Sequence, residues 1–279
     1  MPPMRTVVHL SDLHFGRVDS TLVDPLTRAV RELKPDLVVI SGDLTQRART
    51  TQFIEARRFL DGLPKPRIVV PGNHDVPLYN LPARFLGPFV KYRYYISENL
   101  EPFYADEEIA VVGVNTARSL TVKNGRINQR QLNGICQHLC AYPDVVTKIV
   151  VTHHPFDLPE GYREGSLVGR ARMAMDILAR CGVDVFLAGH LHVSHSRHTG
   201  ERYRIAGYKA LAISAGTALS VRRRSESNAF NVLRIRHPEL ELERYAWQEE
   251  TASFSRFAVD FFERRADGWM RVSDETGTR

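Results

Sequence analysis

The sequence predicts an α/β fold in which two β-sheets pack face to face with helices on their outer sides. Up to about residue 195, apolar runs of four to six residues recur between amphipathic stretches, a pattern typical of strands that alternate with helices. Beyond that point, short strand-like segments follow one another across tight turns. No stretch has the composition of a linker, so we expect a single domain over residues 1–279.

The individual elements follow from the spacing of apolar side chains. Buried strands are expected at residues 6–10, 37–40, 68–70, 109–114, 148–151 and 183–187. Helices are expected at residues 22–33, 53–60, 129–139 and 170–180, where apolar residues recur at helical spacing. Pro35 ends the first helix, and Gly62 with Pro64 ends the second. In the last third, strands are expected at residues 211–214, 228–236 and 240–247.

Two aromatic segments leave alternatives open. The segment 82–104 is irregular and rich in Tyr and Phe, so it is either a cap that selects substrate or a surface helix packed on the domain. The second segment lies near the end of the chain and contains Phe254, Phe257, Phe261, Phe262 and Trp269. These side chains either meet acyl chains or pack in the core, and core packing is the simpler interpretation.

Composition and charge describe an ordinary globular protein. Hydrophobic residues make up 43% of the 279 residues and charged residues 25%, with a net charge of +6. Arginine dominates the basic residues, which suits an anionic substrate but is explained equally well by compositional bias. The run 222–224 of three arginines is expected in a solvated loop. No signal-type core opens the chain and no apolar run approaches ~20 residues, so we expect a cytoplasmic protein; membrane contact is allowed but not expected.

The cysteines show no pairing that is typical of a zinc site. Cys136 and Cys140 stand four apart in a predicted helix, and Cys181 completes an odd number. We expect Cys136 and Cys140 to be core or surface thiols, and a reducing compartment is the simplest inference.

Each of five predicted strands is followed at once by Asp, Asn or His. The segments are Ser11-Asp12-Leu13-His14, Ser41-Gly42-Asp43, Pro71-Gly72-Asn73-His74-Asp75, Thr152-His153-His154-Pro155 and Ala188-Gly189-His190-Leu191-His192. Each segment alone is common in proteins, but five in succession at strand ends are not. Ligands bind at the carboxyl ends of strands in open α/β sheets, so we expect these side chains to share one site.

The spacing within the segments predicts how the side chains converge. Residues two apart in an extended chain point to the same side, so the spacing predicts that Asp12 and His14 reach one ion together, and likewise His190 and His192. We expect the glycines at 42, 72 and 189 to let the chain turn sharply. Imidazole, carboxylate and amide donors without thiolate suit iron, manganese, zinc or cobalt. Seven donors exceed the needs of one ion, so we expect two ions that share Asp43.

Together these motifs closely resemble those of the calcineurin-like metallophosphoesterase superfamily over residues 5 to 195. The resemblance implies a four-layer αββα sandwich of two mixed sheets with two metal ions between them. It implies one ion held by Asp12, His14, Asp43 and His192, and a second held by Asp43, Asn73, His153 and His190. It also implies that His74 contacts the phosphate and the leaving oxygen.

The mechanism expected from this resemblance is phosphoester hydrolysis by in-line attack of a metal-bridging hydroxide. Paired ions ~3.5–4 Å apart lower the pKa of a bridging water and clamp the phosphoryl oxygens, while His74 assists the leaving group. His154 is expected to support the metal ligands from behind. His195 and His198 are expected on a β-hairpin surface, and Arg47 either touches the phosphate or lies at a surface helix start.

The substrate is less well specified than the chemistry. Gly42-Asp43-Leu44-Thr45-Gln46-Arg47 and the final Asp75 depart from the pattern of the protein Ser/Thr phosphatases. The opening segment and the Thr152-His153-His154-Pro155 block are similar to bacterial cyclic-nucleotide and glycerol phosphodiesterases, so a 3′,5′-cyclic nucleotide or related small phosphodiester is the leading expectation. The alternatives are a UDP-2,3-diacylglucosamine pyrophosphatase of lipid A synthesis, a DNA-repair nuclease and a non-catalytic scaffold. We expect no stable nucleic-acid partner, and a homodimer stays open.

Overall fold

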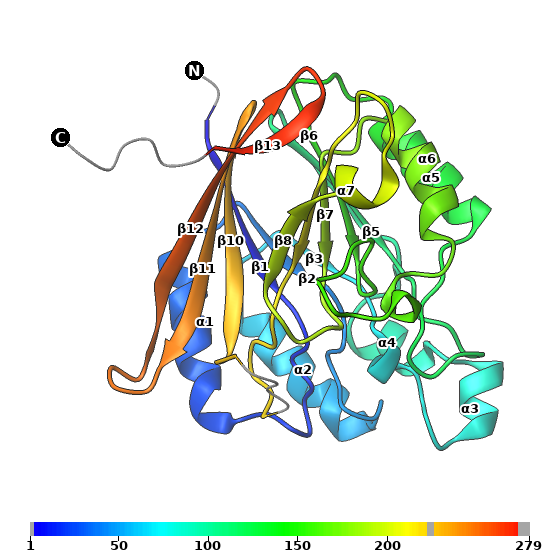
Figure 1. Cartoon of the computed structure of the whole chain (residues 1–279). Helices are drawn as coiled ribbons and strands as arrows, with labels where there is room; N and C mark the ends of the chain where they lie inside the picture. The colour runs from blue at the N-terminus through cyan, green and yellow to red at the C-terminus, as the bar shows by residue number, and fades with distance from the viewer. Residues whose placement is uncertain (1–2, 222–225, 273–279) are drawn as a thin grey trace.

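Two β-sheets lie face to face in the computed structural model of the chain, and helices cover the outer side of each sheet (Figure 1). The structure describes residues 3–221 and 226–272, so the expected arginine loop at 222–224 lies outside the described residues. The four layers are α1 and α2, the first sheet, the second sheet, and α5 with α6. The predicted αββα sandwich is therefore confirmed.

The first sheet combines a parallel part with an antiparallel meander. In spatial order its strands are β13 (Gly268–Val272), β12 (Ser253–Arg265), β11 (Glu239–Gln248), β10 (Ala229–Arg236), β1 (Arg5–Leu10), β2 (Leu37–Ile40) and β3 (Arg67–Val69). β1, β2 and β3 run parallel to one another, and β10 joins β1 in antiparallel register. The carboxyl ends of β1, β2 and β3 therefore meet at one edge.

The second sheet has a parallel centre with an antiparallel strand at each side. Its strands in spatial order are β4 (Phe103–Ala105), β5 (Ile109–Val114), β6 (Thr147–Thr152), β7 (Val185–Ala188), β9 (Leu211–Ser214) and β8 (His195–His198). β5, β6, β7 and β9 run parallel, whereas β4 and β8 pair antiparallel with their neighbours. The ends of β6 and β7 can therefore supply ligands to the same place.

Alternate residues of the central strands are buried on opposite faces. Val7 and Val39 belong to the core between the sheets, whereas Val8 and Val38 pack outward against α1 and α2. The second sheet repeats this arrangement, with Val150 facing the outer helices. Burial on both faces explains why these strands read as continuous apolar runs in the sequence.

The helices that complete the layers come from the connections between parallel strands. The α-helices are α1 (Val23–Glu32), α2 (Thr50–Gly62), α3 (Leu81–Leu86), α4 (Val90–Tyr95), α5 (Gln129–Leu139), α6 (Ala171–Arg180) and α7 (Gly200–Tyr203). Three 3₁₀ turns are η1 (Ser20–Leu22), η2 (Asn73–Asp75) and η3 (Glu164–Ser166). α5 begins at a capping box in which Asn128 accepts a hydrogen bond from the Gln131 amide, which satisfies a backbone donor at the helix start.

Every element expected from the apolar pattern corresponds to an observed strand or helix. The pattern does not predict β12 and β13, which extend the meander beyond residue 247. Of the aromatic residues in this part, Phe254, Phe262 and Trp269 are buried in the two cores of the first sheet, whereas Phe257 and Phe261 are exposed. Core packing therefore accounts for three of the five.

The segment 82–104 is packed on the domain through one face. Tyr92 of α4 is fully buried, and its hydroxyl donates to the carbonyl of Val69 over a distance of 3.0 Å. Leu86, Val90 and Tyr94 on the other side are exposed. The expectation of a cap stays a prediction, because the burial of Tyr92 is compatible with either arrangement.

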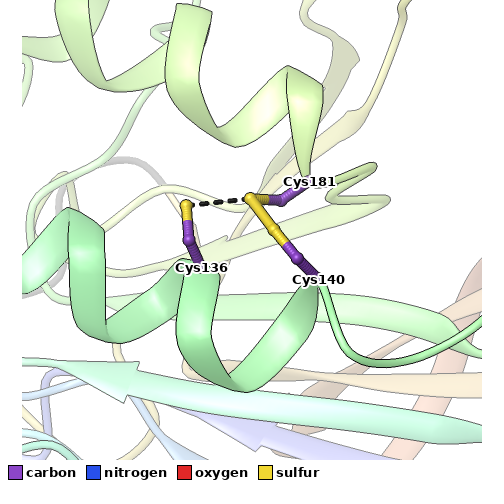
Figure 2. Close-up of side chains that lie close together, drawn as sticks. All are labelled: Cys136, Cys140 and Cys181. Atoms are coloured by element: carbon purple, nitrogen blue, oxygen red, sulfur yellow. Dashed lines mark hydrogen bonds between the residues drawn. A yellow bond between two sulfur atoms is a disulfide. The ribbon is translucent and has the colours of Figure 1, made fainter.

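The expectation of two free thiols on α5 is wrong for Cys140, which forms a disulfide with Cys181 (Figure 2). α5 and α6 pack side by side on the second sheet, so their last residues meet although they are 41 positions apart. Cys136 keeps a free thiol. Within the described residues, no helix combines the length and the apolar character needed to span a bilayer.

Candidate metal centre

All eight predicted site residues lie together at the carboxyl ends of five strands. β1 is followed by Asp12 and His14, β2 by Asp43, β3 by Asn73 and His74, β6 by His153, and β7 by His190 and His192. Three of these strands belong to the first sheet and two to the second. The site therefore bridges both sheets, and its geometry depends on how they pack.

One cluster of donor atoms is formed by Asp12, His14, Asp43 and His192, whose potential ligand atoms all lie within 4.8 Å of one another. The Nε2 atoms of His14 and His192 are 3.2 Å apart, and His192 Nε2 is 3.2 Å from Asp12 Oδ1. Asp12 Oδ1 is buried and accepts no hydrogen bond from the described protein atoms. A buried carboxylate oxygen aimed at two imidazole nitrogens fits a cation, which would satisfy all three atoms.

A second cluster lies beside the first. Asn73 Oδ1 is 3.0 Å from His153 Nε2 and 3.1 Å from His190 Nδ1, and the two histidine nitrogens are 3.3 Å apart. Asp43 Oδ2 lies 3.4 Å from His153 Nε2 and 3.7 Å from His14 Nε2. The Asp43 carboxylate therefore faces both clusters, which is the arrangement of a bridging ligand.

The backbone brings these side chains together in a way that differs from the prediction. Asp12, His14, Asp43, His190 and His192 all have positive φ angles, between 51° and 73°. The predicted extended chain with alternating sides is therefore wrong: left-handed turns bring Asp12 and His14 to the same cluster, but His190 and His192 to different clusters. Non-glycine residues adopt this conformation at a cost of ~1–3 kcal/mol each, and such strain clusters at functional sites.

The three glycines beside the ligands also act differently from expectation. Only Gly42 has a positive φ, of +93°. Gly72 is extended, with a φ of −103°, and a Cβ there would collide with the backbone nitrogen and carboxylate of Asp43. A Cβ on Gly189 would collide with Ser11 Oγ and lie 2.5 Å from Asp12 Oδ2. Gly72 and Gly189 are therefore required for close approach of neighbouring segments rather than for a turn.

We expect Gly189→Ala to destabilise the protein by about 1–3 kcal/mol, because the added methyl group forces Ser11 and Asp12 to move. Metal content should fall as well, since Asp12 would be displaced. Denaturant unfolding and elemental analysis measure the two effects. Gly134→Ala is the matched control, because no atom lies within 4 Å of that Cβ position in α5. Equal stability of the two variants would refute the role given to Gly189.

Burial and neighbouring charged groups together set the protonation states within the site. Burial alone would raise the pKa of Asp12, but His192, His14 and His153 lower it overall to well below its usual range. Burial and the neighbouring His153 lower the pKa of His190 to about 3. Asp12 is thus ionised and His190 neutral at pH 7, and these are the protonation states that bind metal ions.

His74 stands at the edge of the donor clusters. The carbonyl of Gln46 lies 2.8 Å from His74 Nδ1, so Nδ1 is the nitrogen that donates to this carbonyl. The backbone amide of His74 donates to Asp43 Oδ1 over 2.8 Å, and its ring meets the His14 ring edge-on. The hydrogen bond to Asp43 therefore fixes the position of His74 relative to the predicted metal ligands.

Asp75 is a positioning residue for which the sequence predicted no role. Its buried carboxylate accepts hydrogen bonds from the amides of Gly72, Leu44 and Thr45 and from the Thr45 hydroxyl. These bonds tie the turn after β3 to the turn after β2. Asp75 thereby fixes Asn73 and His74 relative to Asp43, and its place at the end of the Gly-Asn-His-Asp motif was the available signal.

His154 lies behind the second cluster, as expected, and its ring nitrogens have protein partners. Its Nδ1 is 2.8 Å from Thr116 Oγ1, and its Nε2 is 2.8 Å from the carbonyl of Lys123. Burial, with help from His190 and His153, lowers its pKa well below the usual range. A neutral His154 therefore anchors the loop that contains Lys123, which lies beside the site.

A cavity of about 200 Å³ opens beside the clusters. It is lined by Gln46, Arg47, Asn73, His74, Val76, Leu78, Val122 and Lys123. Arg47 Nη1 lies 3.3 Å from His74 Nδ1, so Arg47 lies on the cavity wall, and its contact with a phosphate stays a prediction. Lys123 and Val122 were not predicted, because only the packing of their loop on His154 and Asn73 brings them here.

Comparison with known proteins agrees with this geometry. Residues 5–194 match the family model described as calcineurin-like phosphoesterase. The chain belongs to this family. It is accordingly a metal-dependent phosphoester hydrolase.

Two curated relatives of this calcineurin-like phosphoesterase are named as phosphodiesterases. One is a probable glycerophosphodiester phosphodiesterase of Arcobacter nitrofigilis, 27% identical over 67% of this chain and 71% of the relative. The other is a probable cyclic nucleotide phosphodiesterase of a Synechococcus species, 23% identical over 54% of this chain and 58% of the relative. This second match thus spans little more than half of the relative.

A solved structure extends the similarity of fold past the family match. A dimetal phosphatase from Danio rerio superposes with a TM-score of 0.63 and 14% sequence identity, covering 93% of this chain and 99% of that structure. At this identity the comparison shows the fold alone. The share of this chain that is covered exceeds residues 5–194, so the similarity of fold is not confined to the segment that matches the family model.

Two further histidines of this phosphoesterase, His195 and His198, belong to neither cluster. His195 and His198 are half-buried on β8, which pairs antiparallel with β9. This agrees with the expected place on a β-hairpin. Neither residue lines the cavity beside His74.

Proposed function

We propose that this chain is a dinuclear-metal phosphodiesterase that hydrolyses 3′,5′-cyclic nucleotides or a related small phosphodiester. The observation that carries the proposal is the position of Asp43, whose carboxylate faces both donor clusters. A cavity with two basic side chains, Arg47 and Lys123, opens beside them. The names of the two curated relatives support a diester as substrate.

The distances within the two clusters support a proposed set of ligands for each ion. The proposed ligands of the first ion are Asp12, His14, Asp43 and His192, and those of the second are Asp43, Asn73, His153 and His190. The donors are nitrogen and oxygen atoms, which suits manganese, iron, zinc or cobalt. When bound, two such ions supply an activated water and neutralise charge on the phosphoryl oxygens.

The other residues of the site then have distinct tasks. Asp43 and Asp75 hold the turn after β2 and the turn after β3 in a fixed position relative to each other, as their hydrogen bonds indicate. His74 is placed to give a proton to the leaving oxygen through Nε2, because its Nδ1 donates to the Gln46 carbonyl. Arg47 adds a positive charge on the cavity wall for the phosphate.

The size and lining of the cavity favour a compact substrate. About 200 Å³ is small beside the roughly 300–1,000 Å³ typical of ligand pockets. Val76, Leu78 and Val122 add apolar surface to the lining beside the charged groups. A phosphodiester with one small organic arm fits this combination better than a nucleic acid strand does.

A panel of substrates tests the proposal. The protein with added manganese is first assayed with bis-p-nitrophenyl phosphate, because turnover above background establishes hydrolysis. The same preparation is then given cAMP, a glycerophosphodiester, UDP-2,3-diacylglucosamine and single-stranded DNA. We expect the highest kcat/KM with cAMP or the glycerophosphodiester. A higher value with either of the other two would refute the proposed substrate class.

Arg47→Ala should raise the KM for the preferred diester by roughly 10–100-fold, since a hydrogen bond to a charged group contributes about 1.5–3 kcal/mol. The effect on metal content should be small, because Arg47 is not among the proposed ligands. Steady-state kinetics measure the change. Arg49→Ala is the matched control, because Arg49 is exposed and does not line the cavity. Equal KM values for both variants would contradict phosphate binding by Arg47.

One observation favours a second candidate, the UDP-2,3-diacylglucosamine pyrophosphatase. Exposed apolar side chains gather on α3 and on the loop beside the cavity, namely Leu81, Phe85, Leu86, Leu120 and Val122. Arg84 joins the two segments, since its guanidinium donates to the carbonyls of Ser119 and Thr121. Such a surface could meet acyl chains, so the lipid substrate belongs in the panel.

A further inference from the structure

The three cysteines of the chain form one cluster at the ends of α5 and α6 (Figure 2). Cys136 and Cys140 lie one turn apart at the end of α5, and Cys181 follows the last residue of α6. Cys181 is bonded to Cys140, and its Sγ is 2.8 Å from Cys136 Sγ. All three sulfur atoms lie within 4.8 Å of one another, so three soft ligands converge at one point.

The cluster is accessible to solvent, and one of its three residues is held in place by a hydrogen bond. Cys140 is exposed, Cys136 is half-buried and Cys181 is buried. Cys140 and Cys181 line a cavity of about 530 Å³, whose wall also carries Asp144 and Asp176 together with the basic side chains of Lys148, Arg180 and Arg264. The Lys148 ammonium donates to the Cys181 carbonyl over 3.1 Å, which holds that residue in place. A small reductant and a hydrated cation can therefore both reach the sulfur atoms.

Reduction turns this cluster into a potential ligand set. A dithiol that gives two electrons and two protons to the Cys140–Cys181 disulfide is itself oxidised to a disulfide and leaves three thiols in the protein. A metal ion displaces the thiol protons as it binds. Zinc–sulfur bonds of about 2.3 Å in a tetrahedral site imply sulfur atoms about 3.8 Å apart, which lies within the observed separation limit of 4.8 Å.

We propose that Cys136, Cys140 and Cys181 form a second metal site in the reduced protein, which takes one thiophilic cation of the zinc and cadmium class. The site is separate from the proposed catalytic clusters, which contain no sulfur. Formation of the Cys140–Cys181 disulfide removes two of its ligands and closes it. The bound ion would cross-link the ends of α5 and α6 in place of the disulfide. The proposal is independent of the phosphodiester substrate.

Cadmium is a specific probe for this site. Cadmium bound to thiolate gives a sulfur-to-metal charge-transfer band in the ultraviolet, and these are the only cysteines in the sequence. Any such band therefore reports on this cluster, even when cadmium also fills the catalytic clusters. The protein is reduced with a phosphine, separated from it, confirmed to contain three titratable thiols, and then titrated with cadmium.

We expect the band to reach its end point at one cadmium per chain beyond any cadmium that the catalytic clusters take up, and the reduced protein to gain thermal stability. The disulfide form should give no comparable band. Cys136→Ser and Cys140→Ser should each abolish the stoichiometric band, with folding verified by circular dichroism. The His153→Ala variant should retain it, because His153 belongs to the other site.

Two results would overturn the proposal. The first is a reduced protein with three titratable thiols that develops no band even when cadmium exceeds the capacity of the catalytic clusters and this site together. The second is an undiminished band in Cys136→Ser, which would reduce the site to a pair of sulfur atoms. If the first result came with a mixture of Cys136–Cys181 and Cys140–Cys181 disulfides in peptide mapping of the oxidised protein, the cluster would be a thiol–disulfide exchange centre instead of a metal site.

Discussion

Asp43→Asn is expected to lower turnover by at least about a thousandfold, because removing the shared carboxylate weakens the electrostatic stabilisation that both ions supply. Asp43 Oδ2 lies 3.4 Å from His153 Nε2 and 3.7 Å from His14 Nε2. The neutral amide removes a negative charge from between two proposed cations. Metal content should therefore fall from two ions per chain to one or fewer.

The measurement combines elemental analysis with kcat/KM for bis-p-nitrophenyl phosphate. Asp61→Asn is the matched control, since Asp61 is a half-exposed partner of Arg57 on α2. Circular dichroism establishes whether the Asp43 variant is folded. Asparagine can still accept the hydrogen bond from the His74 amide, so loss of the fold is not expected. A folded variant with two bound ions and turnover within tenfold of the wild type would refute the bridging role.

His74→Ala should lower kcat by about 10²–10⁴-fold on an ester with a poor leaving group, the range typical of general acid catalysis. The loss should be much smaller for a p-nitrophenyl ester, because that leaving group needs little protonation. Both ions should stay bound, since His74 belongs to neither donor cluster. This separation of metal content from turnover distinguishes His74 from the seven proposed ligands.

The test of His74→Ala therefore needs two esters, one with a poor leaving group and one with p-nitrophenol, and one control variant. His198→Ala is suitable, because His198 lies on β8 and does not line the cavity. The ratio of the kcat losses on the two esters is the informative quantity. Full turnover of the poor-leaving-group ester by His74→Ala would show that another group protonates the leaving oxygen. An equal loss on both esters would indicate that His74 orients the phosphate instead.

The family and the donor residues could be predicted from the sequence because the signals are local. A strand buried on both faces is a continuous apolar run, and the residue that follows it must lie at the sheet edge. Asp12, Asp43 and His190 were found in this way. The sequence order of strands and helices also determined the α/β layers, since parallel strands need crossover connections that cover the sheet.

What the sequence could not provide depends on contacts between distant segments. The left-handed turns at Asp12 and His190 are held by the junction of the two sheets, where the His190 amide donates to Asp12 Oδ2. The loop that contains Lys123 lies beside the cavity because the Lys123 carbonyl is hydrogen-bonded to His154 Nε2. Likewise, Cys181 meets Cys140 because α5 and α6 share one face of the second sheet. Local patterns determine which residues are available, whereas packing across the sheets decides which of them meet.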